Sequence, residues 1–117
     1  MIKNYVAAVC FLLLVSGVFL GCIKKSAAGN QAFAKAAPEI KTVWDQAVAD
    51  DQTNNYVAAV TGYHSIMSQK ARLTDEQITV VNAAALAINQ RLYAAANNGD
   101  AAAKEASLKL AAMQNQR

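Results

Sequence analysis

The chain is poor in the residues that interrupt helices and in those that build common catalytic or metal sites. It has one proline, five glycines, two cysteines and one histidine in 117 residues. Strand-forming residues never gather into an alternating run, which argues against a sheet. No zinc-site spacing, calcium loop or glycine-rich phosphate loop occurs. We therefore expect neither an enzyme nor a cofactor nor a metal site.

Alanine, by contrast, is abundant. It makes up a quarter of the residues from Cys22 onward, and it has the highest intrinsic helix propensity of all residues. The length allows a single domain with one modest core of three or four helices. The composition therefore predicts an all-α fold, a small bundle of about four helices.

The net charge of +3 is concentrated at one end of the chain. Four of the lysines lie before Pro38, and from Pro38 to the end eight acidic residues face seven basic ones. A nucleic-acid-binding domain would need a basic face. We therefore expect no nucleic-acid partner.

Residues 1–21 have the pattern of a bacterial signal peptide. Lys3 gives a positively charged start, and Val6 to Leu20 is an apolar run of 15 residues interrupted only by Ser16 and Gly17. That length suits a signal-peptide core and is short for a membrane span. The segment predicts export of the remainder of the chain.

The run ends in Phe19-Leu20-Gly21-Cys22, which resembles the lipobox of bacterial lipoproteins. Gly21 and Cys22 fit that pattern, whereas Phe19 and Leu20 replace its usual leucine and small residue. The resemblance implies lipid transfer to the Cys22 thiol and cleavage between Gly21 and Cys22. Stable attachment to a membrane takes more than one acyl chain, as lipoproteins carry. Ile23, in place of the aspartate that retains enteric lipoproteins at the inner membrane, favours the outer membrane facing the periplasm.

Two other interpretations of this segment stay open. Tyr5 to Ile23 gives 19 largely apolar residues, nearly enough for an uncleaved membrane anchor. Ser26-Ala27-Ala28 would also suit ordinary signal cleavage, although two lysines precede it. If the signal is removed, Cys10 is lost with it, and no disulfide is expected in the mature domain.

The rest of the chain divides into a spacer and a helical domain. We expect residues 22–37 to be the lipidated cysteine and a tether with some helix near Phe33, and residues 38–117 to be the domain. Helices are predicted from Pro38 to the polar turn 50–55, from Tyr56 to Gln69, from the Thr74 cap to Asn97, and from Ala101 to about Met113.

Local capping signals support these boundaries. Thr74 to Gln77 reads Thr-Asp-Glu-Gln, a capping box. Gly99 suits a left-handed helix end and Asp100 the cap of the last helix. Asn54 or Asn55 is the candidate cap for the helix that starts at Tyr56. The last helix has the weakest apolar face, formed by Ala103, Ala106, Leu110 and Met113.

The first two helices resemble one tetratricopeptide repeat, the helix hairpin of many interaction scaffolds. Tyr56, Ala59, Tyr63 and Met67 match best, and Ala47 suits the small residue of the first helix. Trp44 lies one place late, Asp50 replaces an aromatic residue, Ala71 replaces the closing proline, and the motif does not recur. The resemblance implies a hairpin that binds peptides or proteins.

Candidate functional side chains are few. Trp44, Tyr56 and Tyr63 are the candidate partner-binding residues, and Tyr93 is the remaining aromatic candidate for lining a binding groove. Aromatic residues at helical spacing more often form a core. His64 has no cysteine or paired carboxylate at ligand spacing, and adjacent Ser65 points elsewhere on a helix. We therefore expect a lipid-anchored cell-envelope protein that acts as an interaction or structural module through an unidentified protein partner or self-association. The alternative is a small-ligand or peptide-binding lipoprotein with a pocket between its helices.

Overall fold

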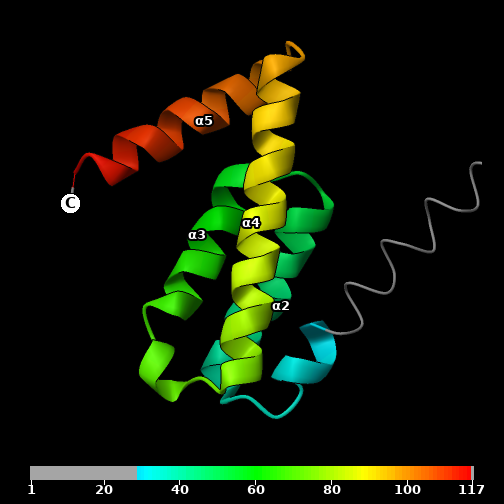
Figure 1. The fold of residues 1–117 in the computed structure, drawn as a ribbon, viewed down its shortest axis with the longest axis vertical. Coiled ribbons are helices and arrows are strands. Elements are labelled where there is room, and N and C mark those ends of the chain that lie inside the picture. Colours follow the sequence, from blue (N-terminus) through cyan, green and yellow to red (C-terminus); the bar gives the residue numbers. More distant parts are fainter. Residues whose placement is uncertain (1–28, 117) are drawn as a thin grey trace, which may run out of the picture.

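The computed structural model describes residues 29–116, and all of its regular structure in that range is helical. The main helices are α2 (Pro38–Gln52), α3 (Tyr56–Met67), α4 (Asp75–Asn97) and α5 (Ala101–Gln114), with a short 3-10 helix, η1 (Lys70–Arg72), before α4. Helix α3 packs against α2, α4 and α5, and α5 leaves the end of α4 and extends away from the other helices (Figure 1). The predicted all-α bundle is confirmed.

Helix α2 begins where the sequence predicts and ends later. Pro38 occupies its first turn, and Ile40, Trp44 and Ala47 are the buried residues. The expected polar turn at 50–55 is only partly correct, because α2 continues through Gln52 and the turn is confined to the next three residues. Asn54 has a positive φ of 57° there, a conformation that asparagine tolerates better than most residues.

Helix α3 crosses α2 at very short range. A Cβ built on Gly62 would lie 2.8 Å from the Cβ of Ala47, so the absence of a side chain on Gly62 lets the two helices touch. Asn55 is the residue before α3, but its side chain makes no capping hydrogen bond. It donates to the Asp50 carboxylate instead, at 3.3 Å. The helix also stops at Met67, two residues before the predicted end.

Helix α4 starts with the predicted capping box. The backbone N–H of Gln77 donates to Thr74 Oγ1 at 3.1 Å, and the Thr74 N–H donates to Gln77 Oε1 at 3.0 Å. Such a cap stabilises a helix by about 1 kcal/mol. Val81, Ile88 and Leu92 then form the buried stripe of the helix.

The α4–α5 junction also follows its local signals. Gly99 has φ +93°, and the Asp100 side chain accepts a hydrogen bond from the Ala103 N–H at 3.0 Å. The predicted apolar face of α5 is only half correct. Ala103 and Ala106 are buried, whereas Met113 is 44% exposed because α5 diverges from the bundle towards its end.

The stretch predicted as a tether is partly helical near Phe33, as expected, but it packs on the domain there and does not act as a spacer. Residues 29–33 are helical, and Phe33 is fully buried in the same core as Trp44. The two rings stack with centroids 4.3 Å apart and planes 11° apart. A lone phenylalanine among alanines carries little periodic signal, so the sequence indicated some helix near Phe33 but not the stacking on Trp44. The folded part therefore begins before Pro38.

Candidate interaction groove

The three predicted partner-binding aromatic residues lie in the core. Trp44, Tyr56 and Tyr63 are 3%, 9% and 2% exposed. Trp44 stacks on Phe33 and lies 5.7 Å from the Tyr63 ring, centroid to centroid. Their helical spacing is therefore explained by packing. Trp44 and Tyr56 do not line the groove described below, whereas the buried Tyr63 forms part of its wall.

Tyr63 is also part of a polar network that joins three helices. Its hydroxyl donates to Asp51 Oδ2 at 2.6 Å, and Arg91 on α4 pairs with the other carboxylate oxygen of Asp51 and with its backbone oxygen. Burial and the hydrogen bond to Asp51 raise the pKa of Tyr63 well above its usual value, so the hydroxyl stays protonated. The Asp51 carboxylate lies in the last turn of α2, where negative charge is unfavourable because of the helix dipole. The positive charge of Arg91 offsets this effect.

His64 and Ser65 lie on the exposed side of α3. Residues 29–116 contain no group of three or more His, Cys, Asp or Glu side chains placed to hold a metal ion. Asp75 and Glu76 lie in the first turn of α4, where negative charge is favourable. His64 lines the entrance of a groove, where its neighbours are apolar or uncharged.

That groove lies between α3, α4 and α5 and has a volume of about 370 Å³. The part of α5 that lines it begins at Ser107, where the helix extends away from the end of α4 (Figure 1). The residues that line it include no aspartate, glutamate, lysine or arginine. They are Val60, Tyr63, His64, Met67, Asn82, Ala85, Asn89, Leu92, Tyr93, Ser107, Leu110, Ala111 and Gln114.

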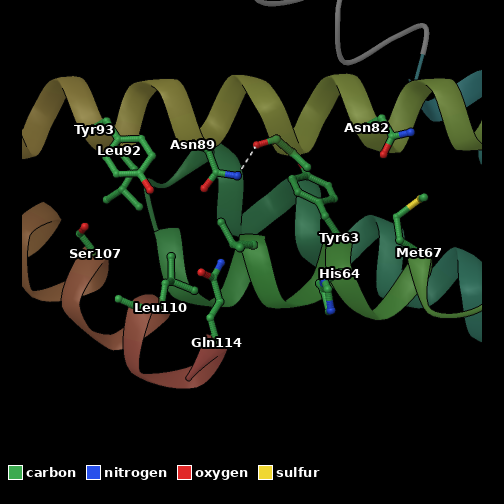
Figure 2. Close-up of a pocket in the computed structure, with 13 residues that line it drawn as sticks. Tyr63, His64, Met67, Asn82, Asn89, Leu92, Tyr93, Ser107, Leu110 and Gln114 are labelled. Atoms are coloured by element: carbon green, nitrogen blue, oxygen red, sulfur yellow. Dashed lines mark hydrogen bonds between the residues drawn. The ribbon is translucent and has the colours of Figure 1, made fainter. Parts of the chain in front are cut away.

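The lining combines apolar side chains with carboxamides. Figure 2 shows the amides of Asn89 on α4 and Gln114 on α5 directed into the same space, with Leu110 beside Gln114. Asn89 uses one amide hydrogen to reach the Ala85 carbonyl at 2.9 Å, which fixes its orientation. The groove can thus hold a ligand by apolar contact and by neutral hydrogen bonds.

Tyr93 is the aromatic side chain that this groove offers to solvent. It is 61% exposed and lies at the end of the groove near Ser107 (Figure 2). The sequence placed Tyr93 among the aromatic candidates but could not rank it above Trp44 or Tyr63. Its neighbours Asn89 and Gln90 gave the one available signal, since polar residues along that side of α4 mark it as outward-facing.

A second hollow adjoins the groove between α3 and α5. It has a volume of about 480 Å³ and shares Val60, His64, Leu110 and Gln114 with the groove. Met113, which is 44% exposed, lines it as well. The opening between α3 and α5 is therefore larger than the groove alone.

Gly21 and Cys22, the predicted cleavage and lipidation residues, lie outside the described residues. Among residues 29–116, no helix is long and apolar enough to cross a membrane. Comparisons with protein-family models, with curated proteins and with solved structures give no match for this chain.

Proposed function

We propose that the protein is a lipid-anchored component of the cell envelope whose helical domain is an interaction or structural module. Removal of residues 1–21 would leave lipid on Cys22 and hold the domain at a membrane, for which we propose the outer membrane facing the periplasm. The observation that supports an interaction role is the open groove between α3, α4 and α5 with Tyr93 exposed beside it.

The groove suits a short segment of a protein partner. It follows α4 from Asn82 to Tyr93, a distance of about 16 Å at 1.5 Å per residue. That equals about three turns of a helix, the length over which amphipathic helices place their anchoring side chains in a groove. Leu92 and Leu110 would bury apolar anchors, and the amides of Asn89 and Gln114 would bind polar groups.

Two exposed residues of α4 provide a matched test of this role. Tyr93 and Leu86 are 61% and 60% exposed, but only Tyr93 lines the groove. Tyrosine is enriched among interface hot spots, whose truncation to alanine weakens binding by about 2 kcal/mol or more. We expect Tyr93→Ala to reduce recovery of a crosslinked partner at least fivefold and Leu86→Ala to leave it unchanged.

The assay is crosslinking in intact cells followed by purification and mass spectrometry, with circular dichroism to verify the fold of each variant. Substitution of Tyr63 would not serve, because that side chain is buried and bonded to Asp51. Finding neither a specific partner nor an oligomer with the wild-type chain would contradict the proposal. If Tyr93→Ala and Leu86→Ala reduced recovery of the partner equally, the groove would not be the binding site.

Anchoring is tested separately from partner binding. We expect the exported chain to incorporate radiolabelled palmitate and Cys22→Ser to abolish both labelling and maturation. Cys10→Ser is the matched control, because Cys10 would be discarded with the signal and its loss should change neither. A wild-type chain that persists at full length without label would favour an uncleaved membrane anchor instead.

The alternative, a small-ligand carrier, is favoured by one observation. The groove volume of about 370 Å³ lies within the usual range for ligand sites, roughly 300–1,000 Å³. A thermal-shift screen of neutral small molecules distinguishes the two functions. A ligand that raises the Tm of the wild-type chain but not of Tyr93→Ala supports the carrier role. If the screen finds no ligand of this kind, the protein-interaction role is favoured.

A further inference from the structure

The helical segment at residues 29–33 is fixed to the rest of the domain. Phe33 is fully buried against Trp44. Gln77 Nε2 donates to the Ala32 carbonyl at 3.0 Å, and Trp44 Nε1 donates to Asn30 Oδ1 at 3.4 Å. Gly29 lies so close to Trp44 that a Cβ there would be 2.5 Å from the indole ring. The domain is therefore held in place from Gly29 onward.

The connection from Cys22 to this fixed point is short. Only residues 23–28 separate Cys22 from Gly29. An extended chain spans at most about 3.6 Å per residue, so the seven steps from Cys22 to Gly29 reach about 25 Å. A spacer that ran to Pro38 would reach about 58 Å. On the shorter link, Gly29 remains within about 25 Å of the lipid-bearing residue.

The link also enters the domain on a defined side. Gly29 packs against Trp44 of α2 and faces Val80 of α4, whereas the groove is lined only by residues of α3, α4 and α5. In Figure 1 the segment at residues 29–33 and helix α5 lie on opposite sides of α4. The point of attachment and the groove therefore face in different directions.

The two sides differ in chemistry as well. The large hydrophobic residues that are exposed among residues 29–116 all belong to α4 and α5, namely Leu86, Tyr93, Leu108 and Met113. The exposed residues of α2 include Thr42, Asp45 and Gln46. Surface helices insert into a bilayer through large apolar side chains. The α2 side lacks them, so it would face the bilayer without insertion.

From these observations we infer that the short link orients the domain, with the side of α2 and residues 29–33 towards the bilayer and the groove towards the aqueous compartment. The inference rests on the proposed lipid anchor at Cys22. Orientation by the link keeps Tyr93 and Leu108 away from the lipid and accessible to a partner. The partner surface is then a soluble segment of an envelope protein within reach of the membrane.

The test measures how close two positions lie to the headgroups of a vesicle. Full-length chain is expressed for export, and the processed lipoprotein is reconstituted into phosphatidylethanolamine–phosphatidylglycerol vesicles that contain a nitroxide-headgroup lipid. Gln46→Cys on α2 and Leu108→Cys on α5 each provide one site for a fluorophore, since the Cys22 thiol is blocked by lipid. We expect at least threefold stronger quenching at position 46 than at position 108.

A second variant isolates the effect of link length. A flexible Gly/Ser insertion of about 15 residues between Ala28 and Gly29 should make quenching at the two positions nearly equal, because the domain then tumbles freely. Equal or reversed quenching without the insertion, in protein whose Cys22 carries lipid by mass spectrometry, would overturn the orientation. Absence of lipid on Cys22 would overturn the anchor proposal, so the two failures are distinguishable.

Discussion

Phe33 offers the most direct test of where the domain begins. Its side chain is fully buried and stacks on Trp44. Replacement of a buried phenylalanine by alanine typically costs 3–5 kcal/mol, from lost transfer free energy and the remaining cavity. A domain of roughly 90 residues has a free energy of unfolding of about 4–13 kcal/mol. We therefore expect Phe33→Ala to lower the free energy of unfolding of the domain by a large fraction.

The measurement is urea unfolding followed by circular dichroism and by the fluorescence of Trp44, the one tryptophan of the chain. Phe33→Leu keeps most of the buried apolar volume and should cost less than about half as much. Gln31→Ala, at an exposed position of the same segment, should change the free energy of unfolding by less than about 0.5 kcal/mol. A loss below about 1 kcal/mol for Phe33→Ala would show that this segment is a tether, as the sequence alone suggested.

Two further predictions concern the interior contacts of α3. Gly62→Ala should destabilise the domain by roughly 1–3 kcal/mol in urea unfolding, because its Cβ would meet that of Ala47 at 2.8 Å; a gain in stability, as helix propensity alone predicts, would contradict the close approach. The pKa of Tyr63 is raised in the folded chain, so the unfolded chain releases the tyrosine proton first as the pH rises. The contribution of Tyr63 to the free energy of unfolding is therefore fully present below pH 10 and falls above it, by about 1.4 kcal/mol per pH unit. Tyr63→Phe should remove this loss of stability at alkaline pH, which unfolding measured from pH 9 to 11.5 would show. At neutral pH the variant should be about 1 kcal/mol less stable, because it lacks the hydrogen bond to Asp51. An unchanged slope of stability against pH would contradict the prediction.

The features predicted correctly from the sequence are those set by local chemistry. The capping box at Thr74, the left-handed Gly99 and the Asp100 cap each depend on residues within four positions of one another. Side chains at these positions satisfy the backbone groups of a helix end whatever the tertiary structure. Most of α4 and α5 follows from these signals.

The features that were mispredicted depend on distant contacts. Asp50 and Asp51 were assigned to a turn by their polarity, but Arg91, forty positions away, pairs with Asp51 and lets α2 continue. Phe33 was assigned to a tether because its partner, Trp44, lies in the next helix. Periodicity identifies which residues lie on one face of a helix, but not how many neighbouring helices cover that face.

The candidate groove was missed for the same reason. Periodicity assigned Leu110 and Met113 to the apolar face of α5, and nothing in the sequence shows that α5 diverges from α3. The divergence leaves Leu110 partly buried and brings Gln114 to the edge of the groove. That Tyr93 lines a groove follows from this geometry and not from the sequence.

The hydrogen bond from Gln77 to the Ala32 carbonyl constrains the order in which the chain folds. Its two residues are 45 positions apart, so this bond of residues 29–33 cannot form until α4 exists. Contacts between distant residues form late in folding because their loops are costly to close. We expect Phe33→Ala to speed unfolding in stopped-flow experiments while leaving the folding rate nearly unchanged. In an exported chain, lipid would then be attached at Cys22 before residues 29–33 have formed their contact with α4.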